Sequence, residues 1–211
     1  MSVDEQALLG RARRGETAAF REIVEVYQGR IYRTVVGMTG DPEDARDVTQ
    51  EVFLKAFEAI GAFKGDSSLH TWLYRIAVNL CIDQLRGRRK RVLLTDLHAG
   101  EDDDGPEHEK LPDAGGVDPL EGALRHEKAD RIGAALGALS ADHRSIIILR
   151  EVEGLSYDEI AKVLGIGLGT VMSRLHYARA RLRGALEAFV KEGEGSHEET
   201  VRFFEPAEKK A

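Results

Sequence analysis

An acidic segment rich in proline and glycine near the middle of the chain limits what this sequence can fold into. Residues 95–122 read TDLHAGEDDDGPEHEKLPDAGGVDPLEG and contain three prolines, five glycines and almost no large apolar side chains. Such a segment cannot bury enough surface to offset the entropy that ordering it would cost. As a flexible linker of about 30 residues it would span roughly 30 Å on average and near 100 Å when taut. We therefore predict two modules that can act far apart.

The charge of the chain is distributed in the same way. Its net charge of -7 argues against nucleic-acid binding, but residues 92–122 alone hold ten acidic residues against one lysine. The tail from residue 191 holds six acidic and four basic residues, so the two modules together carry +4. The acidity thus belongs to the linker and the tail. We place the first module at 1–92, the linker at 93–122, the second module at 123–190 and a disordered tail at 191–211.

The remaining composition is that of an intracellular globular protein. No apolar run approaches the roughly 20 residues of a membrane span, and no secretory signal opens the chain, so we expect no membrane insertion. The single cysteine, Cys81, cannot form an intramolecular disulfide, and its apolar helical surroundings predict a buried side chain. We expect a cytoplasmic protein.

Both modules have the apolar periodicity of helices. Apolar residues recur three and four positions apart with no sustained alternation, which predicts an all-α fold. Asp41 and Pro42 mark a helix start, and Ser156 with Glu159 forms a capping box at another. We expect helices over residues 4–15, 17–37, 41–60, 69–89, 121–138, 141–152, 157–164 and 168–189.

The stretch GIGLGTVMSRLHYARARLRG, residues 165–184, admits two interpretations. A dinucleotide-binding loop needs its third glycine one position later and a preceding strand, whereas LSYDEIAKVLG before it is helical. A P-loop is also excluded, because no Gly-Lys-Ser or Gly-Lys-Thr follows. A helix, a turn and a second helix fit instead, with Gly165 ending the first helix and Gly167 capping the second.

The outer face of the second helix favours DNA binding. It carries serine, arginine, histidine and tyrosine, and residues 165–184 contain no carboxylate. In a helix-turn-helix such side chains reach base edges in the major groove, and the distal arginines meet phosphates. Basic helices also bind membranes or acidic partners, and those alternatives remain open on this feature alone.

Long motifs in both modules resemble one family. Residues 138–183, ALSADHRSIIILREVEGLSYDEIAKVLGIGLGTVMSRLHYARARLR, resemble the fourth conserved region of sigma-70 factors. AFREIVEVYQGRIY, GDPEDARDVTQEVFLKAFEAI and FKGDSSLHTWLYRIAVNLCIDQLRGRRKR resemble the second region. The chain is identified as similar to the extracytoplasmic-function (ECF) sigma factors over nearly all of residues 5–188. Gly167 departs from the serine or proline that the family usually has there.

This resemblance implies a non-enzymatic factor that needs no cofactor. It would bind core RNA polymerase, recognise the minus-ten and minus-thirty-five promoter elements and help to open DNA, under control of an anti-sigma factor. The linker would thread toward the RNA exit path. A stand-alone helix-turn-helix regulator is the alternative, and a nucleotide-binding enzyme built on the glycines is a weaker one. We expect no metal site, because no cysteine or histidine lies at ligand spacing from His176.

The resemblance also implies which residues carry each contact. For core polymerase the candidates lie on helix 41–60 and are Asp44, Asp47, Gln50, Phe53 and Leu54. For the minus-ten element they are Phe63, Lys64, Ser67, Trp72, Arg75, Asn79, Arg86, Arg88 and Arg89. Trp72 is equally well interpreted as a core residue. For the minus-thirty-five element they are Thr170, Met172, Ser173, Arg174, His176, Tyr177, Arg179 and Arg181.

Overall fold

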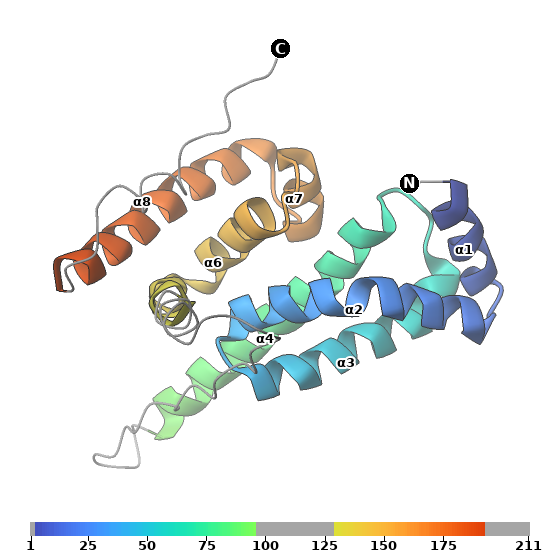
Figure 1. The fold of residues 1–211 in the computed structure, drawn as a ribbon, viewed down its shortest axis with the longest axis horizontal. Helices are drawn as coiled ribbons and strands as arrows, with labels where there is room; N and C mark the ends of the chain where they lie inside the picture. Colours follow the sequence, from blue (N-terminus) through green and yellow to red (C-terminus); the bar gives the residue numbers. More distant parts are fainter. Residues whose placement is uncertain (1–2, 96–128, 193–211) are drawn as a thin grey trace, which may run out of the picture.

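The computed structural model describes the backbone of residues 3–95 and 129–192, and every regular element in these ranges is a helix, as predicted. Side chains are described for residues 5–88 and 129–187. The linker and tail predicted from the sequence lie almost entirely outside the described residues. Figure 1 shows the elements, which are α1 (Val3–Arg13), α2 (Thr17–Thr39), α3 (Pro42–Ala59), η1 (Ile60–Ala62), α4 (Leu69–Thr95), a helical segment at 129–137, α6 (Ala141–Ile147), η2 (Ile148–Val152), α7 (Tyr157–Leu164) and α8 (Leu168–Glu192).

The start signals in the sequence are confirmed. The Asp41 carboxylate accepts hydrogen bonds from the backbone N–H groups of Glu43 and Asp44, at 2.8 and 3.1 Å, and Pro42 occupies the first turn of α3. Gly40 ends α2 in the left-handed conformation, with φ of 75°. These two caps place α3 directly after α2, so that both can pack on α4.

Helix α4 is longer than the sequence predicted. It continues through Thr95, so the basic run RGRRKR is helical and the expected module boundary at 92 falls inside the helix. At 1.5 Å per residue its 27 residues measure about 40 Å. We call residues 3–95 the first module and residues 129–192 the second module.

The second module departs from the sequence prediction in one place. We expected a single α-helix over 141–152, but its last five residues, Ile148–Val152, form a π-helix. Such segments are rare, and no periodicity of apolar residues distinguishes them from an α-helix. The wider turns lead into Glu153 and Gly154, where the chain reverses toward α7.

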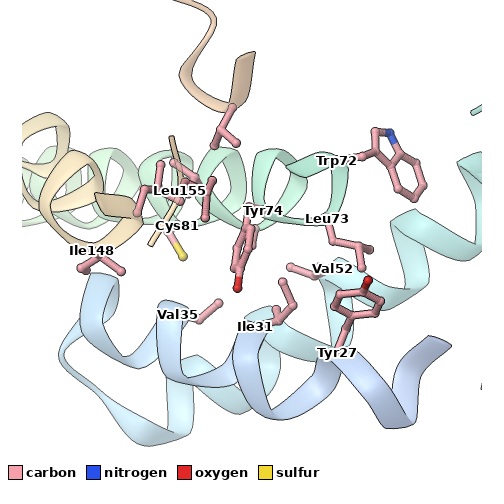
Figure 2. Packing of buried hydrophobic residues seen from close by; sticks show 14 of the residues in the cluster. Tyr27, Ile31, Val35, Val52, Trp72, Leu73, Tyr74, Cys81, Ile148 and Leu155 are labelled. Carbon is pink, nitrogen blue, oxygen red and sulfur yellow. The ribbon is translucent and has the colours of Figure 1, made fainter. Parts of the chain in front are cut away.

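The two modules pack against each other around one continuous core. Figure 2 shows part of it, with Ile31 and Val35 of α2, Tyr74 and Cys81 of α4, and Ile148 of η2. Helix α4 packs on α7 as well as on α2 and α3, and α2 also contacts η2. Over the described ranges, the structure shows the two modules in this closed arrangement.

A buried arginine joins the two modules at the end of α2. Arg144 of α6 is 8% exposed and donates hydrogen bonds to the carbonyl oxygens of Met38, Gly137 and Leu139, at 2.5, 2.7 and 3.4 Å. Burial lowers the pKa of this guanidinium. The last carbonyls of a helix have no partners within the helix. The Arg144 guanidinium of the second module therefore caps the C-terminal end of α2 in the first module.

Candidate nucleic-acid interface

The glycine-containing stretch forms a helix-turn-helix. Ser156 begins α7 with a capping box, in which its hydroxyl accepts from the Glu159 N–H and the Glu159 carboxylate accepts from the Ser156 N–H. Gly165 ends α7 with φ of 64°, as predicted. Gly167 precedes α8 and its carbonyl accepts from Val171 N–H at 3.0 Å, although glycine offers no side chain to cap the helix.

The inner face of α8 holds this unit together. Val171, Leu175, Ala178 and Leu182 are buried, as their spacing predicted, whereas Leu168 at the start of the helix is 39% exposed. The opposite face is exposed and includes Thr170, Met172, Ser173, His176 and Tyr177, of which Tyr177 is 63% exposed. No acidic residue occurs between Glu159 and Glu187. The structure therefore brings these five candidates together on one open face, where their side chains can reach a DNA groove.

The three arginines predicted on this helix have different surroundings. Arg174 forms an ion pair with Asp142 at 3.5 Å, and Arg179 holds Glu151 at 2.6 Å. Arg181 is exposed and has no carboxylate partner among the described residues. Arg179 thus fastens α8 to η2, while Arg181 is available for a phosphate.

A pocket of about 420 Å³ opens at the N-terminal end of α4. Phe63, Lys64, Ser67, Trp72 and Arg75 all line it, and these are five of the nine residues predicted for the minus-ten element. Lys162 of α7 also lines it, so that the pocket receives one residue from the second module. Its aromatic wall and its three basic side chains, which outnumber the one carboxylate at Asp66, suit an unstacked base and the adjoining backbone phosphates.

Trp72 is a core residue, one of its two interpretations, and its role at the minus-ten element stays a prediction. The ring is 7% exposed and packs on Phe63 with ring centroids 4.9 Å apart, while the residue also lines the pocket. A buried pair of rings keeps the wall rigid, and the exposed edge is what a base would meet.

The other four minus-ten candidates lie farther along α4. Asn79 and Arg86 are exposed and outside the pocket. Arg88 forms an ion pair with Asp44 of α3, and the Arg89 side chain lies outside the described residues. About 20 Å of helix separates the pocket from Arg88. A single ligand that contacts both the pocket and Arg88 must therefore be extended.

The candidates for polymerase binding on α3 differ in how far their side chains are exposed. Asp47 and Gln50 are exposed and Leu54 is 58% exposed, whereas Phe53 is 8% exposed and packs in the core. Asp44 is largely buried beside Arg88. Phe57, 45% exposed and one turn beyond Leu54, belongs to the open apolar face but was missed from the sequence. Phe53 and Phe57 lie four residues apart on the same side of the helix, and this spacing gives no signal that separates the buried ring from the exposed one.

Burial and hydrogen bonding change the pKa of two further side chains, Cys81 and Glu159. Cys81 is buried, as predicted, and burial raises the pKa of its thiol to about 12. Burial alone would raise the pKa of Glu159, but hydrogen bonds from Ser156 and the proximity of His70 lower it below its ordinary value. Among the side chains described, those of residues 5–88 and 129–187, no group of three His, Cys, Asp or Glu could hold a metal ion.

Taken together, these features define a two-module helical protein with a helix-turn-helix and a pocket lined by aromatic and basic side chains. Residues 23–91 match the model of Sigma-70 region 2, and residues 129–182 match that of Sigma-70, region 4. RNA polymerase sigma-H factor of Pseudomonas aeruginosa is 37% identical, over 89% of this chain and 96% of that protein. The ECF sigma-E factor of Escherichia coli is 33% identical, over 89% and 96%.

The chain therefore belongs to the sigma-70 family, among its ECF sigma factors. It is a transcription initiation factor for RNA polymerase, and the family is not enzymatic. Over the part of the chain that the structure describes, no helix is long and apolar enough to cross a membrane.

Solved structures share this fold. The sigma factor RpoE of Bartonella quintana, in complex with the anti-sigma factor NepR, matches with a TM-score of 0.62 and 27% identity over 80% of this chain and 96% of that one. CnrH in complex with the cytosolic domain of CnrY matches with a TM-score of 0.63 and 24% identity over 87% and 97%. Both likenesses extend over the two modules.

Proposed function

We propose that this chain directs core RNA polymerase to promoters by dividing three contacts between its two modules. The exposed side of α3, with Asp47, Gln50, Leu54 and Phe57, binds the polymerase. The pocket at the start of α4 takes a base of the opened minus-ten element. The outer face of α8 reads the minus-thirty-five element.

The observation that carries this division is the difference between the two nucleic-acid surfaces. The pocket has a wall of two aromatic rings and offers Lys64 and Arg75, which suits a single unstacked strand. The face of α8 is an open helix surface without carboxylates, which suits the groove of a duplex. A factor that opens DNA needs both kinds of surface.

Promoter opening with and without core polymerase tests the proposal. Permanganate footprinting detects unpaired thymines, and we expect them in the minus-ten element only when the full chain and core are both present. Tight, specific duplex binding by the chain alone, with no dependence on core, would instead identify a stand-alone regulator.

Two substitutions on α8 test how the duplex is read. Tyr177→Ala removes an exposed side chain that can reach base edges, so the order of preference among minus-thirty-five sequences should change. Arg181→Ala removes a phosphate contact, so affinity should fall by a similar factor on every sequence. Equal losses on all sequences from Tyr177→Ala would contradict its role as a base reader.

The same proposal places the protein in the bacterial cytoplasm, under an anti-sigma factor. The likeness to RpoE of Bartonella quintana, solved with its anti-sigma factor, supports such a partner. A pull-down of the full chain from native cell extract should recover the polymerase subunits and one further small protein. Recovery of polymerase alone would remove the anti-sigma partner from the proposal and leave the promoter function standing.

A further inference from the structure

Three cations of the pocket at the start of α4, which we call the α4 pocket, have no protein partner. Lys64, Arg75 and Lys162 line this pocket, and all three side chains are exposed. None of them forms an ion pair or a hydrogen bond with another described residue. Arg88 and Arg179, by contrast, are held by carboxylates. Unpaired cations that line one hollow favour an anionic ligand.

The third of these cations comes from the second module. Helix α7 packs on α4, and the His70 ring in the first turn of α4 lies 3.1 Å from the Glu159 carboxylate of α7. Lys162 lies three residues farther along α7 and so lines the pocket too. A nucleotide within a DNA strand carries one negative charge, whereas three cations match a group that carries two or more. The charge of the pocket therefore suits a diphosphate or a triphosphate.

The wall and the size of the α4 pocket suit a nucleobase. Phe63 and Trp72 form a pair of rings with centroids 4.9 Å apart, and both residues line the pocket. Bases stack on aromatic side chains in this way. The volume of about 420 Å³ lies within the range of about 300–1,000 Å³ that is typical of pockets for small ligands.

One carboxylate in the α4 pocket has no use in binding DNA. Asp66 is exposed and lines the pocket, where its charge repels the phosphates of a strand. In nucleotide-binding sites a carboxylate accepts hydrogen bonds from the hydroxyl groups of ribose. Deoxyribose lacks the 2′-hydroxyl and gives up such a bond. Asp66 therefore favours a ribonucleotide.

We infer that the α4 pocket binds a free ribonucleoside diphosphate or triphosphate. The base stacks on the two rings, Asp66 accepts from the ribose hydroxyls, and the three cations hold the phosphates. The bound nucleotide occupies the place that the proposed function gives to a base of the minus-ten element, so the nucleotide and the opened strand exclude each other. Only this exclusion rests on the proposed function, because nucleotide binding itself needs neither DNA nor polymerase.

The single tryptophan of the chain provides a direct test. Because Trp72 is the only tryptophan, the tryptophan fluorescence of the full chain reports on the α4 pocket. In buffer without divalent cations, we expect ADP to quench this fluorescence and to bind more tightly than AMP. Loss of a hydrogen bond to a carboxylate should make dADP bind about tenfold more weakly than ADP. No quenching by ADP, or equal dissociation constants for ADP and either of the other two nucleotides, would overturn the inference.

Two lysines provide a matched pair of variants. Lys162→Ala removes a cation of the α4 pocket, whereas Lys55→Ala removes an exposed lysine of α3 that pairs with Glu51 at 3.3 Å. With helical circular dichroism unchanged in both, the dissociation constant for ADP should rise about tenfold in Lys162→Ala and stay unchanged in Lys55→Ala. Equal constants for the two variants would contradict the site. Failure to open promoters while ADP still quenches would refute only the proposed function, and promoter opening without quenching would refute only the nucleotide site.

Discussion

The close approach of α2 to η2 makes Gly37→Ala the sharpest test of how the modules pack. A β-carbon built on Gly37 lies 3.0 Å from Cδ1 of Ile148 and 3.5 Å from its Cγ1. Ile148 is 1% exposed, and its branched side chain has few rotamers with which to move away. Gly29 stands on the same helix, where an added β-carbon meets only the end of the Arg33 side chain at 3.9 Å.

The magnitude follows from two opposing terms. Replacing glycine by alanine inside an exposed helix stabilises it by about 1 kcal/mol, and both variants share this gain. At Gly37 the added methyl group overpacks the face between the modules, which costs about 1–3 kcal/mol. We expect Gly29→Ala to be more stable than wild type and Gly37→Ala to lie about 1–3 kcal/mol below Gly29→Ala.

Urea unfolding of the full chain, followed by circular dichroism, measures this difference. With a slope of about 2 kcal/mol per molar urea, the midpoint of Gly37→Ala should lie about 0.5–1.5 M below that of Gly29→Ala. If both variants gain the same stability, Ile148 does not lie against α2 and the closed packing is wrong. This outcome depends on neither DNA nor polymerase.

Three further predictions test the cap, the capping box and the arginines of α8. Arg144→Met leaves the buried Met38 carbonyl without its Arg144 donor, and should lower the free energy of unfolding in urea by about 2–3 kcal/mol. The pKa of Glu159 is lowered in the folded state, so its contribution to the free energy of unfolding is complete above the unfolded pKa and is lost as pH falls through the folded pKa. The free energy of unfolding in urea, measured from pH 6 to 3, should therefore fall less steeply for Glu159→Gln than for wild type. Parallel curves for the two proteins would contradict this. Arg181→Ala should weaken duplex binding in a mobility-shift assay without changing the melting temperature, whereas Arg179→Ala should lower the melting temperature because Glu151 loses its partner; a reversed pattern would exchange the two roles.

Local signals in the sequence predicted the elements well. Asp41, Pro42, Ser156 and Gly165 act through neighbours two to four residues away, so their effects can be read from the sequence without knowing the fold. The periodicity of α8 likewise separated its buried face from its exposed face, apart from Leu168 at the helix start. The exposed face of α8 could therefore be predicted from spacing alone.

Side chains whose partners are distant in sequence could not be assigned in this way. Arg174 and Arg179 look identical to Arg181 in the sequence, and only the packing of α8 on α6 and η2 gives the first two carboxylate partners. The π-helix has no compositional signal, and Phe53 and Phe57 differ only in which side of α3 the other helices cover. Tertiary contacts therefore decide whether a charged side chain stabilises the fold or is available to a ligand.

The face between the modules combines the continuous apolar core with a few directed polar contacts. The Thr34 and Tyr74 hydroxyls of the first module donate to the Glu153 carboxylate of the second, and Arg144 donates to the Met38 carbonyl. A buried donor or acceptor that loses its partner costs about 1–3 kcal/mol, so these hydrogen bonds favour one packing of the apolar face over others. Replacing Thr34, Tyr74 and Glu153 together by apolar residues of similar size should therefore leave the stability of the full chain in urea equal to or above that of wild type. Glu153→Leu alone should lower it by about 1–3 kcal/mol, because the buried Tyr74 hydroxyl loses its acceptor, and equal stabilities for the two variants would show that these contacts do not select the packing.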